Sequence, residues 1–503
     1  MAIDDPLQGT GGDSTADAAE TTDSESGSAP AGSESGGAPA PAPSLGSALR
    51  PLLLRLHFYA GLLIAPLLLV AAASGFLYAL SYQAENVLYR HELRAPVGDR
   101  VLPLSDQLGA AREAHPESTI TSVRLPDEEG ATTRVLMSAP GLGESKSLAV
   151  FVDPYTAEVR GDLVSYGSSG ALPLRTWLSE FHRNLQLGEP GRIYSELAAS
   201  WLWVVALGGL LLWTGRRRAS RRALFVPERG ATGRRRTLSL HGSLGLWAVT
   251  GLVLLSATGL TWSKYAGENI TSIKDQLGSA TPTVSAALEP GTDTGGSGGH
   301  EEHTGGSGGH DMNHMEGMKG MDVGVDLAVV AARQAGLDGP IAVTLPTEGS
   351  GYVIAQTDKQ FPVRLDAVAV DPATGKVIDE LRFADHPVLA QLTRIGIDAH
   401  SGLFLGLFNQ LALALLALSL ILLIVWGYRM WWLRRPTKER RMSAGRPMPR
   451  GAWRKVPLPW LLPLAAVTAL VGWFLPLLGI SLLAFLLLDG ALGLLARVKA
   501  ARA

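Results

Sequence analysis

The sequence predicts a multi-span α-helical membrane protein, built as a parallel tandem repeat of helix, α/β module and helix, with a C-terminal helical hairpin. Three observations carry this prediction. Long apolar runs alternate with polar segments, arginine-rich segments recur at one side of those runs, and two halves of the chain share motifs at the same spacing. The chain has 503 residues, 46% of them apolar. That content allows several spans, because each spanning helix needs about 20 apolar residues.

Four long apolar runs are expected to cross the bilayer as helices, because a helix satisfies its own backbone hydrogen bonds in lipid. They cover about 56–80, 195–215, 241–263 and 403–428. A further run, 457–496, is interrupted by Pro463, Pro476 and Gly479. It is expected to form a hairpin of two short spans, which brings the predicted total to six. Asp489, the one acid inside an apolar run, is expected to meet a nearby basic group such as Arg497.

Arginine-rich segments are expected on one side of this six-span arrangement. The two longest, 216–238 and 433–456, follow the second and fourth spans. Basic loops favour the cytoplasmic side, so the sequence predicts a multi-pass protein of the cytoplasmic membrane with both termini in the cytoplasm. The segments 81–194 and 264–402 then lie outside. Nucleic-acid binding is an alternative interpretation of the arginine runs, but their position beside the spans favours topology, and no nucleic-acid partner is expected.

Composition excludes several kinds of site. The chain has no cysteine, so it has no disulfides, iron–sulfur clusters or thiolate metal sites. The formal net charge of −2 says little about partners, because the charges are unevenly distributed. The first segment is rich in Gly, Ser, Ala, Pro and acids, and it is predicted to be a disordered tail without a secretory signal.

The two outer segments resemble each other. LAVFVDPYTAEVRGDL at 148–163 and AVAVDPATGKVIDEL at 367–381 both predict a strand, an Asp-Pro-x-Thr turn and a second strand. Upstream of each, the pattern predicts a helix followed by a strand that ends in Leu-Pro. Each outer segment is therefore expected to form a small α/β module of about 60 residues.

The shared spacing continues into the apolar runs. His182 and His400 follow the two Asp-Pro-x-Thr turns at the same distance, and His57 and His241 open the first and third runs. Glycines follow these last two histidines at the same two distances, namely Gly61 and Gly75, and Gly245 and Gly259. The chain is therefore predicted to be a tandem duplication in which both units begin in the cytoplasm, which makes the repeat parallel.

These motifs resemble the PepSY-associated transmembrane family, which includes iron-regulated membrane proteins and ferric-siderophore reductases. The resemblance covers roughly residues 50–440 and rests on the two Asp-Pro-x-Thr turns, Leu56-His57 with Ser74-Gly75, FHRNLQLGEPGR before ELAASW, Leu240-His241 with Thr258-Gly259, and DAHSGLFLG. It implies PepSY-like outer modules, b-type haem held by membrane histidines, and electron transfer to ferric iron outside. The terminal hairpin, the acidic tail and a His/Met-rich insertion lie outside the family pattern.

The predicted organisation follows the repeat along the whole chain. In order it comprises a disordered cytoplasmic tail (1–48), span 1 (49–82), outer PepSY-like module 1 (83–170), an outer helix and span 2 (171–215), a basic cytoplasmic loop (216–238), span 3 (239–265), an outer linker with the His/Met-rich segment (266–322), outer PepSY-like module 2 (323–384), an outer helix and span 4 (385–432), a second basic loop (433–456) and the hairpin of spans 5 and 6 (457–498).

Four histidines form two candidate pairs of haem ligands. His57 and His241 are expected at matching depth near the cytoplasmic face, and His182 and His400 at the outer face. A haem iron takes two axial ligands on opposite sides of its ring, and two helices that each offer one histidine supply that geometry. Capping or headgroup contact is the alternative for each histidine, but ionisable groups at membrane depth tend to be functional. With the family resemblance, two haems b are expected, and no catalytic side chain is assigned.

A His/Met-rich segment stands outside the repeat and is a second candidate metal site. Thioether and imidazole together suit Cu(I), and imidazole alone suits Cu(II), Zn or Ni, so copper or iron is expected there. A low-complexity linker with incidental residues is the alternative. The candidate ligands are His300, His303, His310, Met312, His314, Met315, Met318 and Met321.

With what the family resemblance implies, these observations predict a haem-containing electron-transfer protein in the lipid bilayer that reduces extracytoplasmic ferric iron, as a ferric-siderophore or other chelate, or copper. Such a protein is a metalloreductase. No Gly-rich nucleotide motif follows a strand, so the electron donor is expected to be a cytoplasmic protein or a membrane quinol. Arg183, Arg192 and Arg394 are expected to favour haem propionates or an anionic chelate, or else to meet lipid phosphates. The alternative function is a membrane-anchored PepSY binding or regulatory protein without redox activity.

Overall fold

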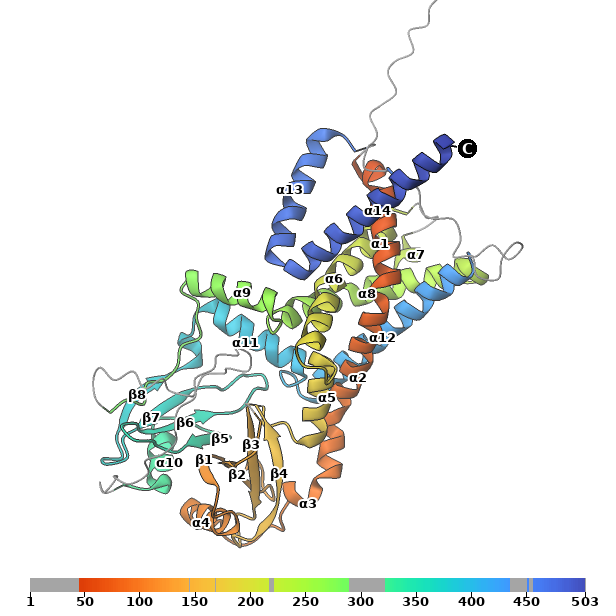
Figure 1. The fold of residues 1–503 in the computed structure, drawn as a ribbon. Helices are drawn as coiled ribbons and strands as arrows, with labels where there is room; N and C mark the ends of the chain where they lie inside the picture. Colours follow the sequence, from red (N-terminus) through yellow and green to blue (C-terminus); the bar gives the residue numbers. More distant parts are fainter. Residues whose placement is uncertain are drawn as a thin grey trace, which may run out of the picture. The chain divides into compact units, whose positions relative to one another are not determined.

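The computed structural model describes residues 45–143, 145–167, 169–216, 221–288, 322–434, 450–451 and 456–502. It contains a set of apolar helices and one β-sheet, with shorter helices between them (Figure 1). The tail predicted over 1–48 lies outside the described residues up to Ser44. Its last four residues are not part of a tail, because helix α1 begins at Leu45.

Within the described residues, five helices are long and apolar enough to cross a membrane, which identifies a multi-pass membrane protein by length and composition. They are α2 (Ala65–Leu88), α6 (Glu189–Thr214), α8 (Gly233–Leu260), α12 (Leu407–Trp432) and α14 (Pro476–Arg502). The buried face of this bundle is made of small and aliphatic side chains, with Trp201 of α6 among the larger ones. Helix α6 packs against α8, and α12 packs against both α2 and α8.

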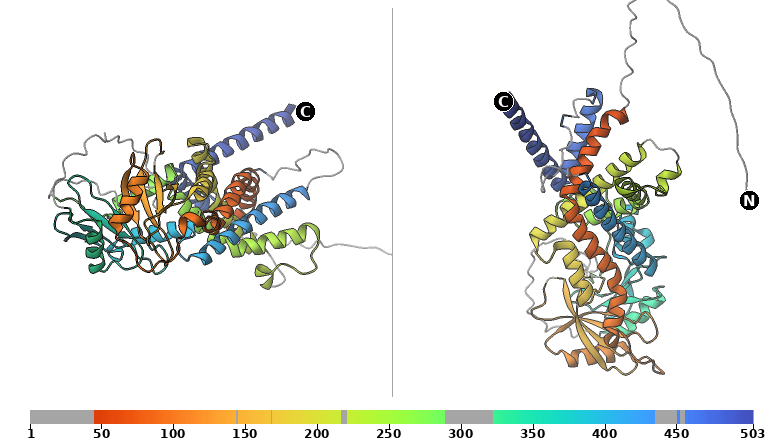
Figure 2. Two further views of the ribbon diagram at one scale, coloured as in Figure 1. Left: turned by 90° about the horizontal axis from the view of Figure 1, so that it is seen from below. Right: turned by 90° about the vertical axis from the view of Figure 1, so that its right-hand side faces the viewer.

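The first predicted span, 56–80, is divided between two helices. Helix α1 (Leu45–Leu63) ends just before Ile64, and α2 then follows directly on from it (Figure 2). Pro66 lies in the first turn of α2, where its missing N–H and fixed φ are tolerated, whereas a helix interior would lose a hydrogen bond there. The break places His57 in α1 rather than in the same helix as Gly75.

The C-terminal hairpin forms with unequal arms. Helix α13 (Leu458–Phe474) has 17 residues, and α14 has 27. The chain turns at Leu475, directly before Pro476, whereas Pro463 and Gly479 lie inside helices. The expectation of two short spans is therefore wrong for α14, which is one of the five helices long enough to cross.

Asp489 in α14 joins the hairpin to the rest of the bundle. Its carboxylate forms an ion pair with Arg55 of α1, and its Oδ1 lies 2.9 Å from Nε of Arg450. The predicted partner Arg497 is therefore wrong. The error arises because Arg497 is near in sequence, whereas the actual partners come from α1 and from the segment that precedes the hairpin.

The polar segments form one eight-stranded antiparallel sheet rather than two separate modules. Its strand order is β4-β3-β2-β1-β5-β6-β7-β8. The strands are β1 (Thr119–Arg124), β2 (Thr133–Ser138), β3 (Lys146–Val152), β4 (Val159–Tyr166), β5 (Ile341–Thr344), β6 (Tyr352–Gln356), β7 (Ala367–Val370) and β8 (Val377–Leu381). The two predicted strand–turn–strand motifs are confirmed as β3–β4 and β7–β8. The two halves join where β1 pairs with β5, with Val123 opposite Val343.

Helices cover one face of this sheet along its length. They are α4 (Leu104–Ala114) and α10 (Val325–Gln334), and their apolar residues share a single core with both halves of the sheet. On the other face, Phe151 of β3 packs with Leu172 and Tyr89, close to the end of α2. The sheet therefore rests directly on the helices that lead to the site. The remaining short helices are α3 (Arg90–Leu93), α7 (Arg222–Phe225), α9 (Tyr265–Gln276) and a 3-10 turn at Phe383–Asp385.

Candidate functional site

Two short helices deliver histidines to the apolar bundle. Helix α5 (Pro173–Asn184) carries His182 in its last turn, and α11 (Val388–Ser401) carries His400 in its last turn. A tight turn follows each helix and leads into a long one, α6 or α12. Gly188 and Gly406 precede those long helices with φ values of 63° and 55°, a conformation that glycine adopts at little cost. The motif FHRNLQLGEPGR contains this turn in the first half of the chain.

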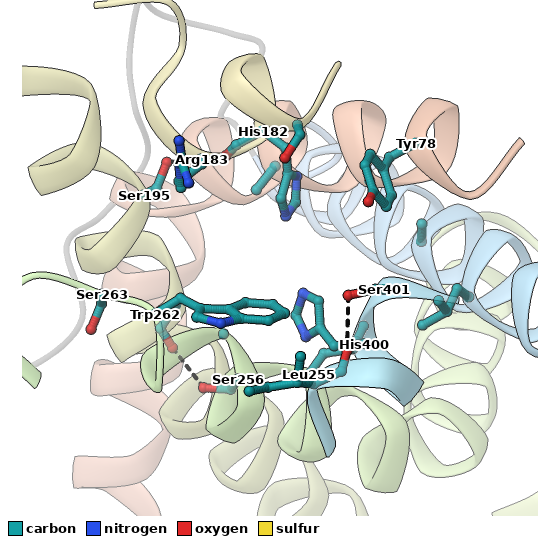
Figure 3. A pocket seen from close by; sticks show the side chains of 18 of the residues that line it. Tyr78, His182, Arg183, Ser195, Leu255, Ser256, Trp262, Ser263, His400 and Ser401 are labelled. Carbon is teal, nitrogen blue, oxygen red and sulfur yellow. Dashed lines mark hydrogen bonds between the residues drawn. The ribbon is translucent and has the colours of Figure 1, made fainter. Parts of the chain in front are cut away.

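His182 and His400 form one pair, named here the sheet-side pair because strand residue Tyr166 lines the same cavity. Their ring centroids lie 6.5 Å apart, with 56° between the ring planes. Figure 3 shows the two rings facing each other across the cavity, with Trp262 beside His400. The Trp262 ring centroid is 5.4 Å from that of His400.

His57 of α1 and His241 of α8 form the second pair, named here the arginine-side pair because arginines line the mouth of its cavity. Their ring centroids are 6.4 Å apart, and the ring planes meet at 78°. In each pair, the two histidines that lie together are those that the sequence grouped. Each pair takes one histidine from each half of the chain.

The separation within each pair matches two imidazoles on one iron. A metal–imidazole bond is about 2 Å long and the ring centroid lies about 1 Å beyond the nitrogen, so two axial imidazoles place their centroids about 6 Å apart. The observed 6.4 Å and 6.5 Å agree with this value. Two histidines in direct contact would have no room for a metal between them.

The Nδ1 atoms of all four histidines have hydrogen-bond partners. Nδ1 of His57 donates to the carbonyl of Val205, and Nδ1 of His241 donates to the carbonyl of Leu423, both at 3.0 Å. A carbonyl can only accept, so the proton lies on Nδ1. Nε2 of each ring is then unprotonated and able to ligate a metal, as metal-binding histidines are usually held.

Hydroxyl groups fix the sheet-side pair in the same tautomer. Oγ of Ser74 lies 2.9 Å from Nδ1 of His182, and Oγ1 of Thr258 lies 2.7 Å from Nδ1 of His400. Each hydroxyl already donates its proton to the preceding turn of its own helix, to the carbonyls of Val70 and Leu254 respectively. The hydroxyl oxygens therefore accept from Nδ1–H. Neither Ser74 nor Thr258 had been assigned a role in holding a histidine.

Burial keeps the sheet-side imidazoles neutral. It lowers the pKa of His400 to about 3, with repulsion from His182 as a further cause, and it also lowers the pKa of His182. Both α5 and α11 lie outside the five spanning helices. At neutral pH each ring therefore keeps the lone pair that a metal bond needs.

A glycine lies against each of the four rings. A Cβ on Gly209 would come within 3.0 Å of the His57 ring and one on Gly75 within 3.4 Å of the His182 ring. In the second half of the chain, a Cβ on Gly427 would lie 4.0 Å from the His241 ring, and one on Gly259 would lie 3.5 Å from the His400 ring. Because these positions have no side chain, the helices approach the rings closely.

The glycines that recur at matching positions in the sequence only partly coincide with those beside the rings. Gly75 and Gly259 lie against histidines, whereas a Cβ on Gly61 meets nothing within 4 Å and one on Gly245 meets only Leu423. Gly209 and Gly427 were missed. The signal was present in the sequence, because each follows its half's outer histidine at the same distance.

One layer of leucine side chains separates the two cavities. Leu68, Leu202, Leu252 and Leu420 line both the sheet-side and the arginine-side cavity, and each comes from a different long helix. The lining of both cavities is otherwise largely apolar. Groups held by the two histidine pairs would therefore be insulated from water and separated by a single side-chain layer.

Basic residues also line the sheet-side cavity, among them Arg183, Arg192 and Arg394. Arg394 forms a bidentate ion pair with the buried Asp398 at 2.8 and 2.9 Å, and Arg192 lies 3.2 Å from Glu189. Arg183 stacks over the Tyr166 ring. Lys264 and Lys359 join this lining and were not predicted.

The donor set suits a macrocycle better than a bare metal ion. Within the part of the chain that the structure describes, no group of three or more His, Asp or Glu side chains could hold a metal ion. Each histidine pair supplies two ligands on opposite sides of a gap, and a porphyrin supplies the four equatorial nitrogens that complete such a site. The predicted His/Met ligands from His300 to Met321 lie outside the described residues.

Comparison with known families assigns the chain to a class. The model of the PepSY-associated TM region matches residues 54–434. The protein therefore belongs to the PepSY-associated transmembrane family, which confirms the resemblance found in the sequence. A search of curated proteins finds no match.

Proposed function

We propose that this protein is a transmembrane haem protein that transfers electrons across the cytoplasmic membrane to a ferric chelate, such as a ferric-siderophore, or to copper outside. The two matched histidine pairs carry the proposal. Their ring centroids lie 6.4 and 6.5 Å apart, and Nδ1 of every ring has a hydrogen-bond partner. Haem b bound at each pair would supply one-electron redox chemistry.

The direction of transfer in this proposal follows from charge. The arginine-side cavity opens beside the basic segments, which the positive-inside rule assigns to the cytoplasm together with both termini. The sheet then lies outside, next to the sheet-side cavity. An electron from a cytoplasmic protein or a membrane quinol would enter at His57 and His241 and leave near His182 and His400.

The chain's own residues would set the conditions for this transfer. The four shared leucines keep water away from the space between the pairs and keep that space thin. Arg183 and Lys359, together with Lys264, which pairs with Glu189, give the sheet-side cavity basic residues for an anionic chelate. Gain of one electron converts Fe(III) to the softer, less charged Fe(II), which weakens a chelate with hard oxygen ligands.

A stopped-flow experiment tests the proposed function. The purified full-length protein is reduced without oxygen and mixed with Fe(III) chelates or Cu(II), while the Soret band is followed. We expect the reduced spectrum to convert to the oxidised one, with one Fe(II) or Cu(I) formed for each electron released. A protein without a Soret band, or one that no acceptor oxidises, would contradict the proposal and favour a binding or regulatory role.

Gly209→Ala should weaken haem binding at the arginine-side pair. The new methyl group would lie 3.0 Å from the His57 ring and would displace this ring from its position opposite His241. We therefore expect about a tenfold loss of haem affinity at that pair. Gly490→Ala is the matched control, because its Cβ meets nothing within 4 Å. Haem titration followed by absorbance measures both. Equal affinity in the two variants would show that Gly209 is not part of the site.

Thr258→Val should affect only the sheet-side pair. Valine keeps the shape of threonine but cannot accept the Nδ1–H of His400, and loss of such a partner typically reduces metal affinity about 10- to 100-fold. Thr468→Val is the control, since Thr468 makes the same hydrogen bond to its own helix without a histidine partner. The measurement is haem retained after exhaustive dialysis against apomyoglobin. Unchanged retention in Thr258→Val would contradict the assigned tautomer.

A further inference from the structure

Four arginines line the mouth of the arginine-side cavity at matching positions in the two halves of the chain. Two of them, Arg50 and Arg234, lie about two helical turns before His57 and His241, which puts each on the same helix face as its histidine. The other two lie just beyond the ends of α6 and α12, namely Arg216 and Arg434.

Arg216 and Arg434 follow, at one and the same spacing, glycines that lie against the histidine rings. Arg216 follows Gly209, and Arg434 follows Gly427, by about two helical turns. The four arginines, called here the arginine quartet, therefore surround one opening from four helices. All four side chains are exposed, whereas the histidines lie deeper in the cavity.

The quartet concentrates positive charge at an opening without acidic lining. Among the residues that line this cavity in the described part of the chain, none is Asp or Glu. The charges of Arg216 and Arg434 act on Arg234, so the guanidinium groups repel one another. Like charges gathered at one opening favour an anionic ligand.

A general excess of arginine near the cytoplasm does not account for this arrangement. Arg235 is next to Arg234 in the chain, yet it pairs with Glu228 at 2.7 Å and does not line the cavity. Of Arg234 and Arg235, only Arg234 lies on the same face of α8 as His241, about two helical turns away. The arrangement therefore selects particular arginines, and the selection follows the histidines.

The cavity defines its ligand by three features. The walls are apolar, the two imidazoles lie deep inside, and the cations are at the mouth. A ligand with a metal centre, a flat apolar body and carboxylates along one edge satisfies all three. Guanidinium groups bind carboxylates through paired, charge-assisted hydrogen bonds.

We propose that the arginine quartet binds the two propionate groups of the haem held between His57 and His241, so that the carboxylate edge of the haem faces the arginine-rich end of the bundle. This inference rests on the proposed function. It assigns four binding residues to that site and fixes the orientation of the haem within it. Two arginines from different halves of the chain would serve each propionate.

Haemin and its dimethyl ester distinguish carboxylate recognition from binding of the macrocycle. The full-length protein, depleted of haem and placed in nanodiscs of neutral phosphatidylcholine, is titrated with each compound and followed by Soret absorbance. His182→Ala is present throughout, so that the titration reports the arginine-side pair. We expect haemin to bind at least about tenfold tighter than the ester, because charge-assisted hydrogen bonds are lost with the carboxylates.

Variants then assign the preference to the quartet. In Arg234→Gln with Arg434→Gln, the preference for haemin should fall to within about twofold, whereas Arg235→Gln should keep it. Equal binding of haemin and ester by the unsubstituted quartet would overturn the inference and leave the histidine assignment intact. No binding of either compound would instead overturn the proposed function. A preference that appears only in nanodiscs with phosphatidylglycerol would identify the arginines as lipid contacts and would also overturn the inference.

Discussion

Alanine at His182 or His400 is expected to remove one of the two proposed haems from the protein, and alanine at His57 or His241 should remove the other. In the proposed sites each ring would supply one of the two protein ligands of its pair, and a glycine and an Nδ1 partner lie against each ring. A six-coordinate site that loses one ligand binds its haem far more weakly. Haem per chain, measured as the pyridine haemochrome, should fall from two to about one.

The four single variants also test the pairing itself. Spectra of His57→Ala and His241→Ala should match each other, as should those of His182→Ala and His400→Ala, while the two sets differ. His91→Ala is the control, because His91 is exposed and contacts Arg160 outside either cavity. Retention of both haems in any of the four variants, with the chain folded, would show that the altered histidine is not a ligand.

Glu85→Gln is expected to cause the largest loss of stability in the sheet-facing part of the molecule. The Glu85 side chain is buried near the end of α2, where Oε1 accepts the backbone N–H of Arg175 at 2.8 Å. Its Oε2 lies 3.1 Å from Nε of Arg175 as a charge contact. Arg134 lies close enough for the Glu85 charge to act on it, and burial lowers the pKa of Arg134 to about 9. Removal of the carboxylate leaves these buried cations without their main counter-charge.

The expected cost is about 3–5 kcal/mol, the range for breaking a buried ion pair by removal of one partner. Thermal unfolding in detergent, followed by tryptophan fluorescence, should show a clearly lower Tm. Since α5 begins near this contact and carries His182 in its last turn, haem at the sheet-side pair should be lost at lower temperature than haem at the other pair. Glu189→Gln is the matched control. Its ion pair with Lys264 is exposed, so the Tm should hardly change. Equal Tm values in both variants would contradict this account.

The repeat spacing in the sequence predicted the histidine pairs, because two halves with the same span order bring equivalent positions to the same depth. It could not predict what surrounds each ring. The contacts of His57 with Val205 and of His241 with Leu423 depend on how α1 and α8 are offset against α6 and α12. That offset follows from side-chain packing, and no local pattern in either helix determines it.

The sheet shows a different limit. Alternation within each half predicted the hairpins β3–β4 and β7–β8, since a hairpin's register follows from its own turn. Pairing of β1 with β5 joins the edge strands of the two halves, which are more than two hundred residues apart in the sequence. The sequence of such a strand does not indicate which other strand it will pair with. The duplication itself remains a prediction, which the matching elements of the two halves support.

The haem content of the full-length protein tests the central claim most directly. We predict two haems b per chain, both low-spin and six-coordinate with two imidazole ligands, as measured by pyridine haemochrome against quantitative amino-acid analysis and by electron paramagnetic resonance. A colourless protein that takes up no haemin when it is supplied would contradict the claim. The four histidines would then hold helices together, and the protein would have another function.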